Sequence, residues 1–152
     1  MGQYHKVVNL DRKEYIDPHR LGCGLKLWEQ IANSPGVGAA LIVLLASHSN
    51  GQGGGDLTES PTATPVIGRW RGDRIAFVGD YDDDVRYRVG RSDKKKISGR
   101  NIYSKCHAEE SGAWRDVSDE VCAVLESALD GKFIGDGWRS FKPRVPAEQD
   151  SK

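Results

Sequence analysis

The chain has 152 residues, of which 38% are hydrophobic and 29% charged, so it is long and apolar enough to bury a core without disulfides or metals. Acidic and basic residues balance at 22 each, which argues against a general nucleic-acid-binding protein but is compatible with a local basic patch. Three widely spaced cysteines, Cys23, Cys106 and Cys122, are too few for a disulfide framework and favour a reduced, cytoplasmic setting.

The N-terminal residues predict a hairpin followed by a short helix. Apolar residues on both sides of the polar stretch 9–13 indicate a β-hairpin over residues 4–16. Residues 25–32 place their apolar side chains at helical spacing, which indicates a short helix. The opening residues lack the apolar stretch of a secretion signal, so we expect no export.

A second helix is predicted over residues 34–47. Ser34 is a good N-cap, and proline is favoured at the first helical position, where Pro35 stands. The alternative is a buried strand over residues 40–45, and we favour the helix because of its length and start signal. The apolar run 37–46 is well short of the roughly 20 residues that span a bilayer, so we expect no membrane partner.

The middle of the chain predicts a meander of three short strands after a long connection rich in Gly, Ser, Thr and Pro. The strands are expected at residues 66–70, 74–79 and 85–89, and the last alternates most cleanly between apolar and basic side chains. An acidic turn at residues 80–84 separates the second strand from the third.

The C-terminal part predicts one clear helix over residues 117–129, because its apolar residues recur at helical spacing and Asp119 and Glu120 suit its N-terminus. Residues 91–105 are basic and polar, with a short strand expected at Ile97 or at residues 102–103.

The order of these elements predicts an α+β protein. We expect a mainly antiparallel sheet, made of the N-terminal hairpin and the three-strand meander, with two to three helices packed on one face. Residues 1–142 would form a single domain, and residues 143–152 a disordered tail.

Several motifs in the first 84 residues resemble a family of small uncharacterised proteins of actinobacteria and bacteriophages. The segments that carry the resemblance are the opening MGQYHKVVNLDRKEYI, PHR at 18–20, GLKL at 24–27, GGGDL at 53–57, GDRI at 72–75 and GDY at 79–81. The resemblance implies a phage or prophage setting and an accessory role, such as a host-modulating or anti-defence factor. It implies no catalytic residues.

The glycine-rich run 51–56 is the first candidate site. Consecutive backbone N–H groups in glycine turns can bind an anion. The run has no lysine after its glycines and the wrong spacing for a P-loop or a dinucleotide-binding fingerprint. It is therefore either a flexible connection or a loop that contacts a ligand, through Gly53, Gly54, Gly55 and Asp56.

A second candidate site combines an aromatic ring with nearby cations. Trp70 would stack on a base while Arg69 and Arg71 hold phosphates. Arg86 and Arg88, on one face of a later strand, would extend the basic stripe. The alternative is a core Trp70 with solvated arginines. Together with the glycine-rich run, these residues predict a site for a nucleotide-like anion.

The densest acidic cluster, residues 80–84, is the candidate metal site. Its spacing does not continue as an EF-hand, because glycine is missing from the sixth position and glutamate from the twelfth. Asp80 and Asp82 would hold Mg²⁺ or Ca²⁺ with help from Asp56 or Asp73; the alternative is a charged turn that protects a sheet edge.

These patterns favour a small binding protein over an enzyme, without a required cofactor. Its expected partner is a host protein or a small phosphorylated ligand that it sequesters. One alternative is a metal-dependent phosphoester hydrolase that uses the four aspartates named above. The other is a structural or interaction subunit, for which a homo-oligomer would be expected.

Overall fold

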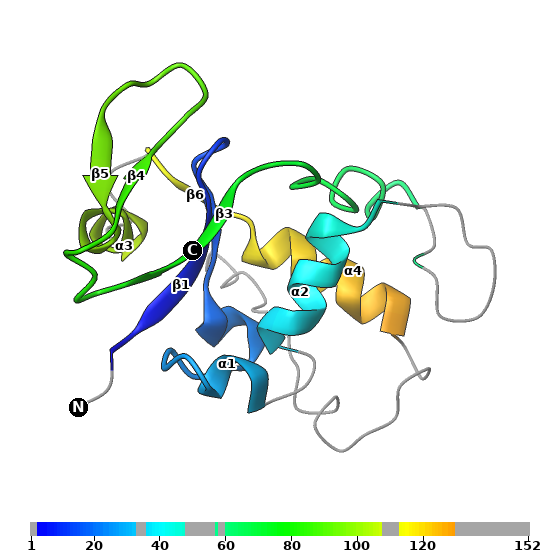
Figure 1. Cartoon of the computed structure of the whole chain (residues 1–152). Coiled ribbons are helices and arrows are strands. Elements are labelled where there is room, and N and C mark those ends of the chain that lie inside the picture. Colours follow the sequence, from blue (N-terminus) through cyan, green and yellow to red (C-terminus); the bar gives the residue numbers. More distant parts are fainter. Residues whose placement is uncertain (1–2, 33–35, 48–56, 58–59, 108–112, 130–152) are drawn as a thin grey trace, which may run out of the picture.

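The computed structural model describes residues 3–32, 36–47, 57, 60–107 and 113–129 (Figure 1). The glycine-rich run and the expected C-terminal tail lie outside these residues. The elements in chain order are β1 (His5–Asn9), β2 (Glu14–Ile16), the 3-10 helix η1 (Pro18–Leu21), α1 (Glu29–Ala32), α2 (Gly36–Leu45), β3 (Ile75–Gly79), β4 (Arg86–Arg88), β5 (Lys96–Ser98), α3 (Gly99–His107), β6 (Arg115–Asp116) and α4 (Ser118–Leu129).

A four-stranded sheet in the order β3-β1-β2-β6 forms the centre of the molecule. Strand β1 pairs antiparallel with both β2 and β3, so Val7 lies between Ile16 and Phe77. The short strand β6 pairs parallel with β2 and completes one edge. Strands β4 and β5 form a separate antiparallel hairpin. The predicted α+β class and the N-terminal hairpin are confirmed.

The two faces of the central sheet belong to two different cores. Val7 and Ile16 pack on one face with α2, α4 and the segment around Trp70. Val8, next to Val7 and therefore pointing the other way, packs with α3 and with the apolar side of the β4–β5 hairpin. Figure 1 shows α2 and α4 on one side of the sheet and α3 with the hairpin on the other. The helices thus cover both faces, where the sequence predicted one.

Helix α2 occurs where the apolar run predicted a helix, not a strand. It buries Val37, Ala40, Val43 and Leu44, as expected for a helix that is apolar nearly all round. Within the described ranges, no helix has the length and apolar character needed to cross a membrane.

The prediction of a strand at residues 66–70 is wrong, because these residues form consecutive turns. Their backbone N–H groups satisfy the end of α2: Gly68 N donates to Val43 O (2.8 Å) and Trp70 N to Leu44 O (2.9 Å). Gly68 has a φ of +70°, which favours glycine, and a Cβ there would lie 2.7 Å from Ala46 O.

The rest of the predicted meander is rearranged. Strand β3 forms as expected but pairs with β1, and β4 pairs with β5 rather than with β3. The helix predicted over residues 25–32 is shortened to α1 because the preceding residues pair with the start of β1. There, Leu25 O accepts from His5 N (2.8 Å), and Lys26 bridges to Tyr4.

Helix α3 is the element that sequence reasoning missed. The strand at Ile97 is confirmed as part of β5, but residues 102–103 are helical. Ser98 begins the helix by accepting a hydrogen bond from Asn101 N (3.2 Å). Lys6 ends it: its side chain is buried, and Nζ donates to Cys106 O (3.1 Å) in the last turn, where the helix dipole favours a cation.

Candidate anion-binding site

The residues predicted to form the aromatic–arginine site do not form a ligand surface together. Trp70 is fully buried, and its indole N–H donates to Glu14 Oε1 (3.0 Å). Arg69 forms a bidentate ion pair with the same carboxylate, with Nε 2.9 Å from Oε1. The burial supports the alternative that Trp70 is a core residue, since a base can stack only on an exposed ring.

Arg71 and Arg86 also do not join Trp70 and Arg69 in one binding site. Arg71 Nε donates to Ala46 O (2.8 Å) and so helps to hold the end of α2. Arg86 lies on β4, whose Tyr87 packs against the core on the other face of the sheet from Trp70. Its guanidinium contacts Lys96 O at 3.4 Å.

The acidic side chains of residues 80–84 stabilise their turn and connect it to neighbouring segments. Asp80 Oδ1 accepts from Tyr4 N (2.9 Å), and Asp82 Oδ1 accepts from Val85 N (3.3 Å). Asp83 pairs with Arg100 (2.9 Å). In the described part of the chain, no three His, Cys, Asp or Glu side chains are grouped so that they could hold a metal ion.

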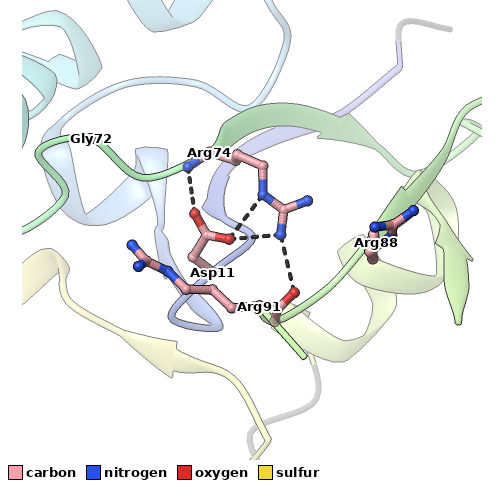
Figure 2. Close-up of a pocket in the computed structure, with 6 residues that line it drawn as sticks. Asp11, Gly72, Arg74, Arg88 and Arg91 are labelled. Atoms are coloured by element: carbon pink, nitrogen blue, oxygen red, sulfur yellow. Dashed lines mark hydrogen bonds and ion pairs between the residues drawn. The ribbon is translucent and has the colours of Figure 1, made fainter. Parts of the chain in front are cut away.

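A different set of residues lines an open cavity of about 470 Å³, which we call the arginine pocket. Three segments far apart in the sequence contribute to it: the β1–β2 turn, the start of β3 and the end of β4 (Figure 2). Its lining residues are Asp11, Gly72, Arg74, Arg88, Gly90 and Arg91.

Arg74 is held in place by Asp11. Its backbone N donates to Asp11 Oδ2 (2.8 Å), its Nε to Oδ1 (2.9 Å), and its Nη2 to Oδ1 (2.6 Å) and to Gly90 O (3.1 Å). The Asp11 side chain is only 7% exposed, and these hydrogen bonds from Arg74 hold the pKa of Asp11 below its ordinary value. The guanidinium is therefore fixed before any ligand arrives.

A second buried carboxylate, Asp73, anchors the neighbouring arginines. Arg12 Nε lies 2.7 Å from Asp73 Oδ2, and Arg91 Nη2 lies 3.1 Å from Oδ1. Asn9 donates a further hydrogen bond at 3.0 Å. Burial alone would raise the pKa of Asp73, but the hydrogen bonds from Asn9 and Arg12 outweigh it, and the pKa lies below its ordinary value.

The pocket and its anchors carry a surplus of positive charge. Four arginines (Arg12, Arg74, Arg88 and Arg91) face two carboxylates (Asp11 and Asp73), which leaves an excess of two positive charges. Arg88 is exposed, and its guanidinium makes no hydrogen bond or ion pair with any residue that the structure describes. Figure 2 shows it standing apart from the Asp11–Arg74 pair.

Two glycines shape the backbone around the pocket. Gly72 and Gly90 have φ values of +76° and +77°, and a Cβ on either would meet no atom within 4 Å. Glycine is therefore favoured at both positions by the left-handed turn, not by lack of space. These turns deliver Arg74 and Arg91 to the pocket.

The sequence contained part of the signal for this pocket. Arg86 and Arg88 alternate along one predicted strand, and a further arginine follows at 91. What the sequence did not show is that Asp11 and Arg74, 63 residues apart, would meet. No protein-family profile, no curated protein and no solved structure matches the chain.

Proposed function

We propose that this protein is a small binding protein that sequesters a phosphorylated, nucleotide-like ligand in the arginine pocket. The observation that carries the proposal is the exposed guanidinium of Arg88, which has no partner among the described residues and lines the same pocket as the fixed guanidinium of Arg74. Planar guanidinium groups bind phosphate through paired hydrogen bonds, and an arginine that is already fixed loses little entropy on binding.

The pairing of Asp11 and Asp73 with arginines favours ligand binding over catalysis in the arginine pocket. Asp11 is occupied by Arg74, and its lowered pKa makes it a weak proton acceptor. Asp73 is likewise occupied by Arg12 and Arg91. The arrangement therefore supports electrostatic capture of an anion, and nothing in the described residues favours the metal-dependent hydrolase that the aspartates suggested.

Isothermal titration calorimetry with mono-, di- and cyclic nucleotides and with inorganic phosphate tests the proposal. Arg88→Gln should weaken the best ligand about tenfold or more, because a hydrogen bond to a charged group contributes about 1.5–3 kcal/mol. Arg86→Gln is the matched control, since Arg86 lies two residues away on the same strand but outside the pocket. Equal effects of the two substitutions, or no binding to folded wild-type protein, would contradict the proposal.

We also propose a phage or prophage setting, in which removal of a phosphorylated signal from solution would make the protein a host-modulating or anti-defence factor. The support is the resemblance of residues 1–84 to small phage and actinobacterial proteins. Infection of a host that expresses the wild type, Arg88→Gln or Arg86→Gln would test it. The wild type and Arg86→Gln should protect the phage, and Arg88→Gln should not. Equal plating efficiency with all three proteins would contradict this role.

A second candidate function, engagement of a host protein, is favoured by an apolar surface at the other end of β1. Trp28 is 76% exposed, and Leu27 and Tyr4 are also exposed. Tyr4 O accepts from Asp80 N (3.0 Å), which brings the exposed Tyr81 near. Exposed Trp and Tyr residues are common anchors of protein interfaces. Trp28→Ala should abolish a complex isolated with the wild type; an unchanged complex would exclude this surface.

A further inference from the structure

Positive charge is concentrated in one region of this electrically balanced chain. Residues 86–107 contain eight Lys and Arg but a single acidic residue, Asp93. Because the whole chain has a net charge of zero, the rest of it carries a net excess of seven acidic residues. The zero net charge therefore hides a strongly basic region, which comprises the β4–β5 hairpin and α3.

The hairpin also places like charges together. Arg88 and Lys96 are direct partners across the β4–β5 pair, so their side chains lie on the same face. Like charges directly opposite one another destabilise a hairpin. Lys94 and Lys95 lie in the loop that connects the two strands, and all of these side chains are exposed. This arrangement opposes folding and becomes favourable when an anion lies between the charges.

Basic side chains extend beyond the arginine pocket along the hairpin. Arg88 and Arg91 line the pocket, and Lys96 lies directly across the hairpin from Arg88. The lysines at 94, 95 and 96 are not among the lining residues of the pocket. A single nucleotide in the pocket would leave them unused, whereas a ligand with several phosphates in series would use them.

We propose that the ligand of the arginine pocket is a nucleic-acid strand, with one phosphate in the pocket and the following phosphates along Lys94, Lys95 and Lys96. The inference rests on the proposed function and extends it from a nucleotide to a chain of nucleotides. The binding would be directed at the backbone: within the hairpin, no large aromatic or aliphatic side chain is exposed for stacking.

The same feature argues against an acidic protein as the partner of this surface. The apolar side chains of the hairpin, Tyr87, Val89 and Ile97, all pack inward against the core that contains Val8. Protein interfaces need a desolvated centre with apolar or aromatic anchors, and the exposed side chains of this hairpin are charged or polar. Binding to a phosphate backbone needs no such centre, because its free energy comes largely from counterion release.

Fluorescence anisotropy with a labelled single strand of about 12 nucleotides, a length within the site sizes of single-strand binders, tests the proposal. DNA and RNA strands, a mononucleotide and poly-glutamate are compared over a range of salt concentrations. The triple variant Lys94→Gln, Lys95→Gln, Lys96→Gln removes three phosphate contacts, so its slope of log affinity against log salt should be shallower by about 2. Lys26→Gln, a change at an exposed lysine far from this region in the sequence, is the control and should leave the slope unchanged.

The strand should bind more tightly than the mononucleotide, and the triple variant should lose that advantage. The mononucleotide should still bind the triple variant, which would show that the pocket is intact. If the mononucleotide binds and the strand binds no more tightly, the inference is wrong and the proposed function stands. If neither binds, both fail. If poly-glutamate binds as well as the strand with the same slope, the surface takes any polyanion and the nucleic-acid assignment is overturned.

Discussion

The buried carboxylate of Glu14 provides the sharpest test of how this fold is held together. The Glu14 side chain is only 4% exposed and accepts hydrogen bonds from Arg69 and from the indole of Trp70. Replacement of Arg69 by Met would leave the negative charge of Glu14 in the core with the indole N–H as its remaining donor. Loss of one partner from a buried ion pair costs about 3–5 kcal/mol. Because the Arg69 side chain is 28% exposed and admits some water, we expect about 3 kcal/mol for Arg69→Met.

The reverse substitution should cost less. Glu14→Gln keeps an acceptor for the Trp70 indole, and the unpaired Arg69 can turn toward solvent, so we expect about 1–2 kcal/mol. The double variant Arg69→Met, Glu14→Gln removes the uncompensated charge and should be more stable than Arg69→Met alone.

Urea unfolding of the wild type and the three variants, followed by circular dichroism, would measure these differences as changes in midpoint at constant slope. The reasoning is refuted if Arg69→Met costs less than about 1 kcal/mol, or if the added Glu14→Gln makes it no more stable.

Three further predictions concern stability. Lys6→Met removes the cation at the C-terminus of α3 and leaves Cys106 O without this donor. The free energy of unfolding in urea titrations should fall by about 1–3 kcal/mol, and an unchanged value would mean that the contact does not stabilise the fold. Because the pKa values of Asp11 and Asp73 are lowered, both carboxylates stabilise the fold above about pH 4, and this stabilisation is lost as pH falls through their folded-state pKa values. The free energy of unfolding of Asp73→Asn should therefore fall less steeply at acid pH than that of the wild type, and equal pH dependence of the two proteins would contradict this. Gly68→Ala should lower the melting temperature more than Gly72→Ala, because both have positive φ but a Cβ approaches a backbone carbonyl only at Gly68; equal shifts would show that the close approach does not matter.

Local patterns were enough to predict the elements whose hydrogen bonds are local. The β1–β2 hairpin follows from its polar turn, and α4 from its apolar periodicity and acidic first turn. Residues 66–70 predict a strand because Ile67 and Arg69 alternate with the residues between them, but the N–H groups of Gly68 and Trp70 are used to complete α2. That requirement comes from a helix more than 20 residues earlier, so no local rule reveals it.

The candidate site depended even more on distant contacts. The sequence singled out Arg69 and Trp70 because they are adjacent, yet both are committed to Glu14, 55 and 56 residues away. Arg74 becomes a site residue only because the β1–β2 turn brings Asp11 to it. Helix α3 has a helical apolar pattern at Ile102, Tyr103 and Cys106, but the many basic and polar residues around it are typical of a solvated turn.

Because strand β1 belongs to both cores, ligand binding at one end of it should affect the stability of both halves of the molecule. Its successive residues Val7 and Val8 belong to opposite cores, and the residues that follow it include Asp11 of the arginine pocket. Neither core can open without losing the strand that the other shares, so the two halves should exchange their amide hydrogens as one cooperative unit. Occupation of the pocket should then slow exchange not only in the nearby hairpin but also in α2, on the far side of the sheet.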